Sequence, residues 1–313
     1  MKVGVIGAGQ WGQNLVRAFS RLGALAAVAE INHEARERLA AEFPGVPLYE
    51  DCNYLLESDI PAVVIATPAS THYQIAKKAL LSGKDAFVEK PLALSLAEAR
   101  ELVEIAESKE SILMVGHLLL YQPAVQWIKN YLASGALGDV GFMVQERLKL
   151  GLVRAVENVL WSFGVHDIAV LLHLVEEKPE EVKAVGRCFL QEGVADDVYV
   201  HLRFPGGVQA HLHTSWLWPE TRRRLTIVGA RAMLVYDELE QKVTLHKKWV
   251  GPALGHHDEG SEVVFQGSSE PLLLECRHFL ECLEKRETPL SDGRSAVAVL
   301  EVLEAAEKQL RSS

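Results

Sequence analysis

Residues 2–12 read KVGVIGAGQWG, and this stretch decides the fold of the first half of the chain. Residues 2–6 predict a strand, and a Gly-x-Gly-x-x-Gly loop follows it directly and opens a helical pattern at 10–22. Such a loop lets backbone N–H groups approach a pyrophosphate at a helix N-terminus. The alternative is a glycine-rich turn that only packs the helix on the strand. The strand–loop–helix context favours the first interpretation, and we expect a dinucleotide to contact Gly7, Gly9, Gln10, Trp11 and Gly12.

The first 115 residues alternate between strand and helix patterns. Helical patterns, for example at 10–22 and 71–82, separate short and continuous apolar runs, which are typical of a parallel sheet buried on both faces. The alternation predicts βαβ units, and therefore an α/β Rossmann domain with a doubly wound parallel sheet. The predicted strands are residues 2–6, 25–30, 46–49, 62–66, 85–89 and 111–115.

After Gly116 the pattern changes. Several strand patterns follow one another between residues 182 and 246, and two of them meet at Pro205-Gly206-Gly207, a hairpin loop. We predict an α+β domain with an open, mostly antiparallel sheet. Its other expected elements are helices at 122–133 and 165–176, a strand at 142–150, a surface loop at 250–269, and closing helices at 271–286 and 293–311.

Length and composition narrow the class of protein. A chain of 313 residues favours two domains, and we place the dinucleotide-binding domain at 1–118 and a substrate-binding and oligomerisation domain at 119–313. The net charge of −10 argues against nucleic acid as a partner. Apolar runs are too short to cross a membrane, and residues 1–6 lack the pattern of a signal peptide, so we expect a cytoplasmic protein. The four cysteines have no metal-binding spacing and predict reduced thiols.

Glu30 ends the second predicted strand, about 20 residues beyond the glycine loop, where an acid would bind the adenosine ribose hydroxyls. A carboxylate there repels a 2′-phosphate, so NAD is favoured over NADP as the cofactor. The alternative is a solvated acid at a strand end. Thr67, Pro68 and His72 follow the fourth strand at its carboxyl end, where we expect further cofactor contacts, and Ser70 or Thr71 also suits a helix cap.

Lys90 follows an apolar strand and precedes Pro91. Most lysines at strand ends are only solvated. Partial burial and a cationic nicotinamide would lower the pKa of Lys90 and suit it to proton transfer, with Glu89 as its counter-ion.

His166 lies at the expected start of the 165–176 helix, where the helix dipole would favour the neutral ring and suit a general base. A capping or core histidine is the alternative. His211, His213, His256 and His257 lack a metal-ligand pattern, and we expect no metal.

These motifs together resemble the Gfo/Idh/MocA oxidoreductases over essentially the whole chain. The resemblance is carried by the glycine loop, by ATPASTH at 66–72, by EKP at 89–91 and by Gly116-His117. It implies a Rossmann domain followed by an open-sheet domain, and it makes Lys90 the active-site lysine. The segments 116–125 and 157–167 are most similar to the sugar-nucleotide 3-dehydrogenases of surface-polysaccharide and lipid A gene clusters, which oxidise the C3 hydroxyl of UDP-N-acetylglucosamine or its uronate with NAD.

The resemblance implies that Lys90 and His166 are catalytic, and that Tyr121, Arg154 and Asn158 line the substrate site with them. The chain departs from the family pattern at Ser162 and Val170, where many members have aspartate, so either Lys90 or His166 could take the hydroxyl proton. Two other hypotheses stay open: a dehydrogenase of a free polyol or monosaccharide, and a catalytically silent sensor that binds NAD. An open sheet face also predicts a homodimer or homotetramer.

Overall fold

The computed structural model describes residues 1–155, 157–268 and 270–311. The chain divides into two compact units, Met1–Tyr121 with Glu270–Leu300 and Gln122–Ser269 with Glu301–Ser313. The predicted boundary at 118/119 lies close to the first break. A single boundary is incomplete, however, because Glu270–Leu300 belongs to the first unit.

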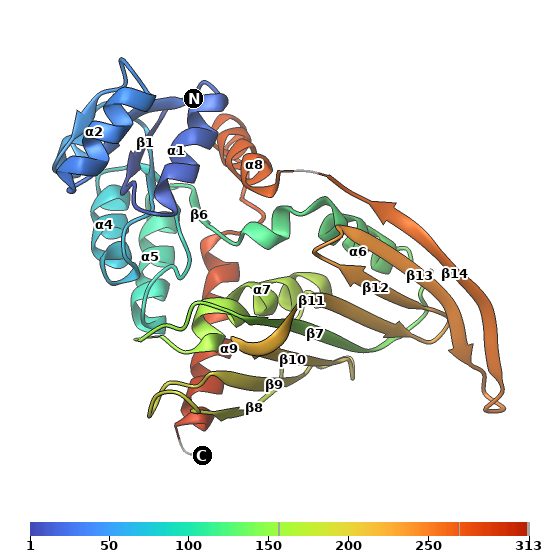
Figure 1. Ribbon diagram of the computed structural model, residues 1–313. Coiled ribbons are helices and arrows are strands. Elements are labelled where there is room, and N and C mark those ends of the chain that lie inside the picture. The colour runs from blue at the N-terminus through green and yellow to red at the C-terminus, as the bar shows by residue number, and fades with distance from the viewer. Residues whose placement is uncertain (156, 269, 312–313) are drawn as a thin grey trace. The chain divides into compact units, whose positions relative to one another are not determined.

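The first unit is built on a six-stranded parallel sheet in the order β3-β2-β1-β4-β5-β6, so the predicted doubly wound Rossmann fold is confirmed. On its faces α4 packs on α5 and α8 packs on α1 (Figure 1). The strands are β1 (Val3–Ile6), β2 (Leu25–Ala29), β3 (Leu48–Tyr49), β4 (Ala62–Ile65), β5 (Asp85–Val88) and β6 (Leu113–Val115). The helices are α1 (Gly12–Arg21), α2 (His33–Glu42), α3 (Asn53–Leu56), α4 (Ala69–Leu81), α5 (Leu96–Ser108), the 3₁₀ turn η1 (Leu118–Tyr121) and α8 (Pro271–Lys285).

The returning segment is held to the first unit by aromatic packing and by backbone pairing. The ring of Phe279 on α8 lies 6.5 Å from that of Phe19 on α1 and 5.5 Å from that of Phe87 on β5. Further along, the N–H of Val115 donates to the carbonyl of Ser291 at 2.8 Å. This pairing covers the free edge of β6, which would otherwise offer unpaired backbone groups.

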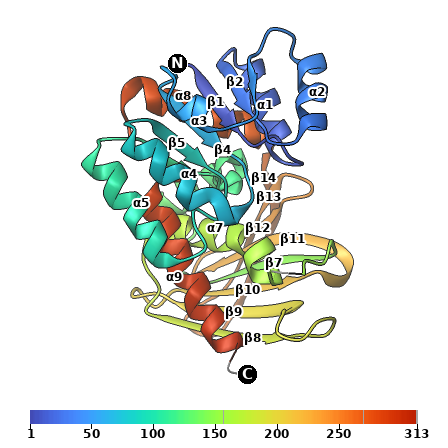
Figure 2. The same ribbon diagram turned by 90° about the vertical axis from the view of Figure 1, so that its left-hand side faces the viewer.

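The second unit contains an eight-stranded sheet in the order β14-β13-β12-β11-β7-β10-β9-β8. Only the β7–β10 pair is parallel among the described pairs, so the predicted open and mostly antiparallel sheet is confirmed. Helix α7 packs on β10 (Figure 2). It also packs against α6. The elements are α6 (Pro123–Ala133), β7 (Val140–Leu150), the π-helical turn η2 (Leu160–Gly164), α7 (Val165–Val175), β8 (Glu181–Arg187), β9 (Asp197–Arg203), β10 (Gln209–Ser215), β11 (Leu217–Gly229), β12 (Met233–Asp237), β13 (Lys242–Val250), β14 (His256–Gln266) and α9 (Gly293–Leu310), whose first turns belong to the first unit.

The surface loop predicted at 250–269 is wrong for most of its length, because residues 256–266 form β14, which pairs with β13 along an edge hairpin. Residues 256–263 are all exposed to solvent. A strand that is exposed on both faces carries no apolar alternation, so hydrophobic periodicity had nothing to detect. Ser269 lies outside the described residues.

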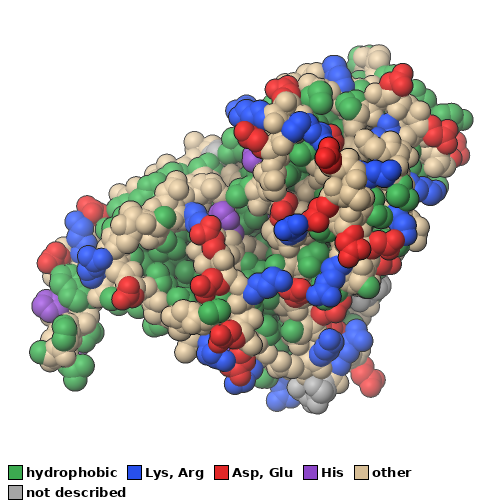
Figure 3. Space-filling model, turned by 180° about the vertical axis from the view of Figure 1, so that it is seen from behind, with side chains coloured by type: hydrophobic (Ala, Val, Ile, Leu, Met, Phe, Trp, Pro, Cys, Tyr) green, Lys and Arg blue, Asp and Glu red, His purple; other side chains and the backbone are tan. Residues whose placement is uncertain are grey.

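One face of the molecule is mixed in charge. Figure 3 shows acidic and basic side chains interspersed over this face, with hydrophobic side chains between them. Among the described residues, no helix combines the length and apolar character needed to cross a bilayer.

A buried ion-pair network joins α7 to the sheet of the second unit. Arg147 on β7 donates from Nε to Asp167 Oδ2 at 2.7 Å and from Nη2 to Glu238 Oε2 at 2.7 Å. Gln145 adds a hydrogen bond to Asp167 Oδ1 at 2.9 Å, and Arg223 donates to Glu238 Oε1 at 3.1 Å. Asp167 is fully buried, so its charge depends on these partners.

Replacing Asp167 by alanine is expected to lower the free energy of unfolding by about 3–5 kcal/mol, because it leaves the buried Arg147 guanidinium with one carboxylate fewer. The urea midpoint measures this effect. Arg203→Ala, which removes exposed ion pairs on β9, is the matched control and should leave the midpoint almost unchanged. Equal shifts in the two variants would contradict the role of the buried network.

Candidate active site

The carboxyl ends of β1, β2 and β4 meet at one edge of the parallel sheet, where open α/β sheets bind ligands. A cavity of about 730 Å³ lies at this edge. It brings together the glycine loop, the acid after β2 and the loop after β4, as the sequence predicts. The cavity is lined by Ile6, Gly7, Gly9, Ala29, Glu30, Ile31, Glu50, Asp51, Cys52, Ala66, Thr67, Pro68, Thr71 and Ile75.

The glycine loop has the shape that a dinucleotide needs. Gly7 has a φ of +88°, and a Cβ there would lie 2.8 Å from the Ala66 carbonyl oxygen. A Cβ on Gly12 would lie 2.2 Å from the Gly7 carbonyl oxygen, so glycine is required where α1 approaches β1. At Gly9 a Cβ would meet nothing within 4 Å. The loop therefore leaves open space beside the helix N-terminus, and a pyrophosphate fits there.

Glu30 is fixed at the base of this cavity. Its carboxylate accepts hydrogen bonds from the backbone N–H of Ala8 at 2.6 Å and of Asn32 at 2.8 Å. The Arg36 guanidinium, which could otherwise attract a phosphate, donates to the carbonyl oxygens of Glu30 and Ile31. This end of the cavity is consequently acidic and suits ribose hydroxyls better than a phosphate.

His72 links two loops of the site. One ring nitrogen lies 2.8 Å from the carbonyl oxygen of Thr67 and the other lies 2.7 Å from that of Pro91. Burial lowers the pKa of His72, and the charge of Lys90 acts in the same direction. The ring thereby ties the loop after β4 to the Lys90-Pro91 turn, whose peptide bond is cis. Its predicted contact with the cofactor stays a prediction.

Glu89 is the buried acid of the strand end that carries Lys90. Its carboxylate accepts a hydrogen bond from Trp11 Nε1 at 2.5 Å and from the N–H of Lys90 at 3.2 Å. A Cβ on Gly116 would lie 2.9 Å from Glu89 Oε2, so this glycine makes room for the carboxylate. Burial raises the pKa of Glu89 to about 7, against the opposing effects of Trp11 and Lys90. The glycine loop and the lysine segment are therefore joined through one side chain.

His117 is a site residue that the sequence reasoning used only as a family marker. The imidazole is buried after β6, and neither ring nitrogen has a hydrogen-bond partner among the described residues. Burial, assisted by the charge of Lys90, lowers the pKa of His117 to about 4 and keeps the ring neutral. A buried neutral ring with unused polar atoms at this strand end fits a polar group of a bound ligand.

His166 lies on α7 in the second unit, but it does not lie at a free helix N-terminus. The turn η2 runs directly into α7, and Gly164 is the last residue of this turn. The expected effect of the helix dipole on His166 stays a prediction. Ser162, which stands where many family members have aspartate, is buried and its hydroxyl donates to the Val159 carbonyl at 3.4 Å.

The three residues that the resemblance adds to the substrate site differ in placement. The buried hydroxyl of Tyr121 bonds Ser291 Oγ at 2.8 Å within the first unit. Asn158 is also buried; its Oδ1 accepts from the N–H of Leu160 at 3.0 Å, and its Nδ2 donates to Glu307 at 2.6 Å. Both polar groups are thus used inside the protein. The Arg154 side chain is half exposed, and its guanidinium pairs with the Glu157 carboxylate at 3.7 Å.

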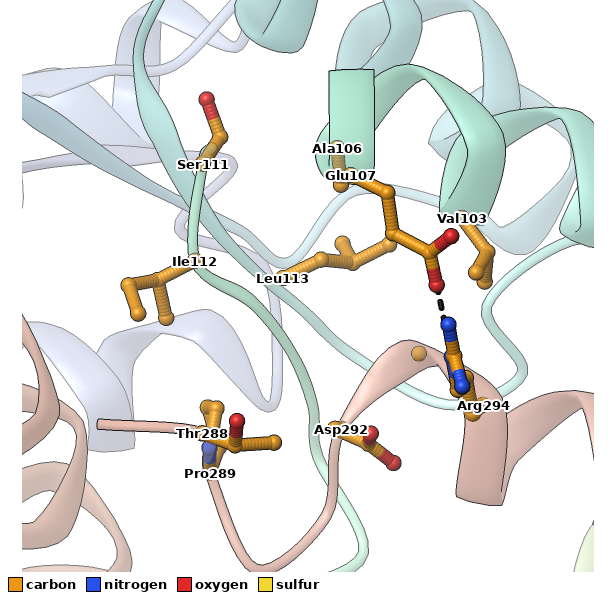
Figure 4. A pocket seen from close by; sticks show the side chains of 11 residues that line it. Val103, Ala106, Glu107, Ser111, Ile112, Leu113, Thr288, Pro289, Asp292 and Arg294 are labelled. Atoms are coloured by element: carbon orange, nitrogen blue, oxygen red, sulfur yellow. Dashed lines mark hydrogen bonds and ion pairs between the residues drawn. The ribbon is translucent and has the colours of Figure 1, made fainter. Parts of the chain in front are cut away.

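A second cavity, of about 320 Å³, lies beside the amino end of β6, away from the carboxyl edge (Figure 4). Its walls come from α5, from the residues before β6 and from the segment before α9. The Glu107–Arg294 ion pair at 2.6 Å lies in its lining.

Comparison with known families and proteins agrees with this geometry. The model of the oxidoreductase family with an NAD-binding Rossmann fold matches residues 1–117, and that of the GFO/IDH/MocA C-terminal domain matches residues 125–235. The UDP-N-acetylglucosamine 3-dehydrogenase of Acidithiobacillus ferrooxidans is 28% identical over 99% of this chain and 99% of its own. Its solved structure superposes with a TM-score of 0.89 at 26% identity, over 100% of this chain and 98% of the other.

Other relatives have different substrates. The scyllo-inositol 2-dehydrogenase (NAD(+)) of Bacillus subtilis is 27% identical over 88% of this chain and 83% of its own. Levoglucosan dehydrogenase, solved with NADH and levoglucosan, shares the fold with a TM-score of 0.88 at 20% identity, over 100% of this chain and 97% of that one. These relatives are named dehydrogenases, which supports an enzyme rather than a silent sensor. With both domains matched, the chain belongs to the Gfo/Idh/MocA family of oxidoreductases and begins with its NAD-binding Rossmann domain.

Proposed function

We propose that this protein is an NAD-dependent dehydrogenase that oxidises the C3 hydroxyl of a UDP-amino sugar such as UDP-N-acetylglucosamine or its uronate. The observation that carries the proposal is the similarity to UDP-N-acetylglucosamine 3-dehydrogenase, which runs from end to end of both chains. A free polyol is the second candidate, because the inositol dehydrogenase of Bacillus subtilis is about as similar in sequence.

The cofactor is assigned to the cavity at the carboxyl edge of the first unit. Gly7, Gly9 and Gly12 would hold its pyrophosphate, and Glu30 its adenosine ribose, with Thr67 and Pro68 lining the same space. NAD, when bound, accepts the hydride. The remaining proposed cofactor contacts are Gln10, Trp11, His72, Glu89 and Lys90.

Lys90 and His166 are proposed as the residues that handle the proton of the substrate hydroxyl. Lys90 follows β5 at the ligand-binding edge, and its backbone is held by the Glu89 carboxylate. His166 follows η2 on α7, and its neighbour Asp167 is fixed by Arg147 and Gln145, so the helix backbone at this point is firmly positioned. His166 would accept the hydroxyl proton, and Lys90 would polarise the same oxygen.

Arg154 is retained as a substrate contact, because an exposed guanidinium suits the diphosphate of a sugar nucleotide. Tyr121 and Asn158 stay proposed substrate contacts, and their polar groups also have partners within the protein. A homodimer or homotetramer is also proposed. The exposed residues Phe142, Val185 and Tyr199 on the second unit's sheet support it, since exposed apolar side chains favour association.

The experiment that tests the function is absorbance at 340 nm with purified protein, NAD and a panel of sugars. UDP-N-acetylglucosamine or its uronate should yield NADH, and free N-acetylglucosamine should not. Glutamate and a partner aminotransferase would remove the ketone and draw the reaction forward. Turnover of inositol or glucose without any nucleotide requirement would instead establish the second candidate.

Lys90→Met is expected to lower kcat by about 10²–10⁴-fold, because it removes a proton-handling group without adding bulk. The dissociation constant for NAD, measured by calorimetry, should change by less than about threefold. Lys109→Met, at the end of α5, is the matched control and should behave as the wild type. If Lys90→Met mainly abolished NAD binding, the proposed role in proton transfer would be refuted.

Glu30→Ala is expected to shift the preference from NAD toward NADP by about tenfold or more, since it removes the carboxylate that would repel a 2′-phosphate. The ratio of kcat/KM for the two cofactors measures this shift. The control is Glu34→Gln on α2, which should leave the ratio as it is. An unchanged ratio in Glu30→Ala would place the adenosine ribose elsewhere.

A further inference from the structure

Two histidines of the second unit face each other across neighbouring strands. Strands β9 and β10 are antiparallel neighbours (Figure 1), and their register places His211 directly opposite His201. Side chains at opposite positions project from the same face of a sheet, with Cβ atoms about 4.5–5.5 Å apart. The adjacent residues Val200 and Leu212 are buried on the other face, whereas neither histidine is buried. The pair therefore lies on the solvent-exposed face of the sheet.

The two rings converge on one point. Their centroids are 4.7 Å apart with planes inclined by 41°, and the Nδ1 atom of His201 lies 3.1 Å from that of His211. Two nitrogens that bind one zinc ion at about 2.0–2.1 Å lie about 2.9–3.4 Å from each other. Burial and the charge of His201 lower the pKa of His211, so this ring is neutral and offers a lone pair near pH 7. The separation of the two Nδ1 atoms is therefore that of two ligands of one metal ion.

The hairpin between the strands sets this arrangement before any ligand binds. The N–H of Phe204 donates to the carbonyl of Val208 at 2.9 Å, and Gly207 has a φ of +83°, which favours glycine. This tight turn fixes the register that pairs the histidines. On the other side of β10, the ring of Phe142 makes a T-shaped contact with His211 at 6.4 Å. Two rings that are already oriented lose little entropy when they bind an ion together.

The charges beside the pair are compatible with a bound cation. Lys183 on β8 lies opposite His201, but its ammonium pairs with the Glu181 carboxylate at 2.8 Å, which reduces repulsion of a metal ion. On β7 the apolar Val144 lies opposite His211. Within the described part of the chain, no third histidine, cysteine or acid forms a metal-binding group with the two rings. Water would therefore complete the coordination.

We propose that His201 and His211 form a binding site for a divalent transition-metal ion such as Zn²⁺ or Cu²⁺ on the exposed sheet face of the second unit. Imidazole nitrogens suit these ions, whereas Mg²⁺ and Ca²⁺ prefer oxygen ligands. Spacing in the sequence shows no metal-ligand pattern here, because the two ligands are ten residues apart and belong to different strands. Only the pairing of β9 with β10 brings them together.

Calorimetry with the full-length protein, after treatment with EDTA and without sugar or cofactor, tests this site. ZnCl₂ at pH 7.5 should bind with a dissociation constant on the order of 10 μM, and MgCl₂ should not bind. His201→Gln and His211→Gln should each weaken Zn²⁺ binding by about tenfold or more. His256→Gln, which removes an exposed histidine on β14, is the matched control and should bind as the wild type does. Absence of Zn²⁺ binding in the wild type, or unchanged binding in both pair variants, would overturn the proposal.

Electron paramagnetic resonance with one equivalent of Cu²⁺ counts the ring nitrogens directly, since Cu²⁺ binds such ligands most tightly among these ions. The wild type should show hyperfine coupling to two imidazole nitrogens, and either pair variant to one at most. A spectrum without nitrogen coupling, or one that is the same in the wild type and in His201→Gln, would contradict the site. Circular dichroism checks that the variants fold, and either of the two variants suffices for the comparison.

Discussion

The close approach of α1 to the end of β1 is the constraint on which the first unit depends. A Cβ on Gly12 would lie 2.2 Å from the Gly7 carbonyl oxygen, so the helix can begin here only because position 12 has no side chain. This contact fixes where the helix N-terminus points and leaves the space beside Gly9 open. It also places Trp11 where its indole reaches Glu89, and thereby connects the glycine loop to the end of β5. The absence of a side chain at position 12 thus positions both the cofactor cavity and the segment that carries Lys90.

The strands of the first unit could be predicted because each is buried on both faces and reads as a continuous apolar run. The same logic fails for β14, whose residues are exposed on both faces and give no periodic signal. It also fails for α8, since an amphipathic pattern shows that a helix is buried but not which unit buries it. Pairings between distant segments, such as Val115 with Ser291, have no local signature in the sequence.

The candidate site was partly predictable for a related reason. The glycine loop and the acid at the end of β2 have a fixed spacing that is typical of dinucleotide binding. The structure places Gly7, Gly9, Glu30 and Thr67 around one cavity. Hydrogen bonds between polar residues that are far apart in the chain have no such spacing. The bond between the hydroxyls of Tyr121 and Ser291, which are 170 residues apart, could therefore not be predicted.

The return of Glu270–Leu300 to the first unit has a consequence for how the chain is made. During synthesis, Phe19 and Phe87 leave the ribosome long before Phe279 can cover them. The edge of β6 likewise stays unpaired until Ser291 has been synthesised. The Rossmann unit therefore cannot complete its core until nearly the whole polypeptide has been translated, although most of its residues are made first. Once residue 269 has been translated, the second unit lacks only the last turns of α9 and can begin to fold while the first unit still exposes apolar surface. During this period the nascent chain can aggregate or bind chaperones.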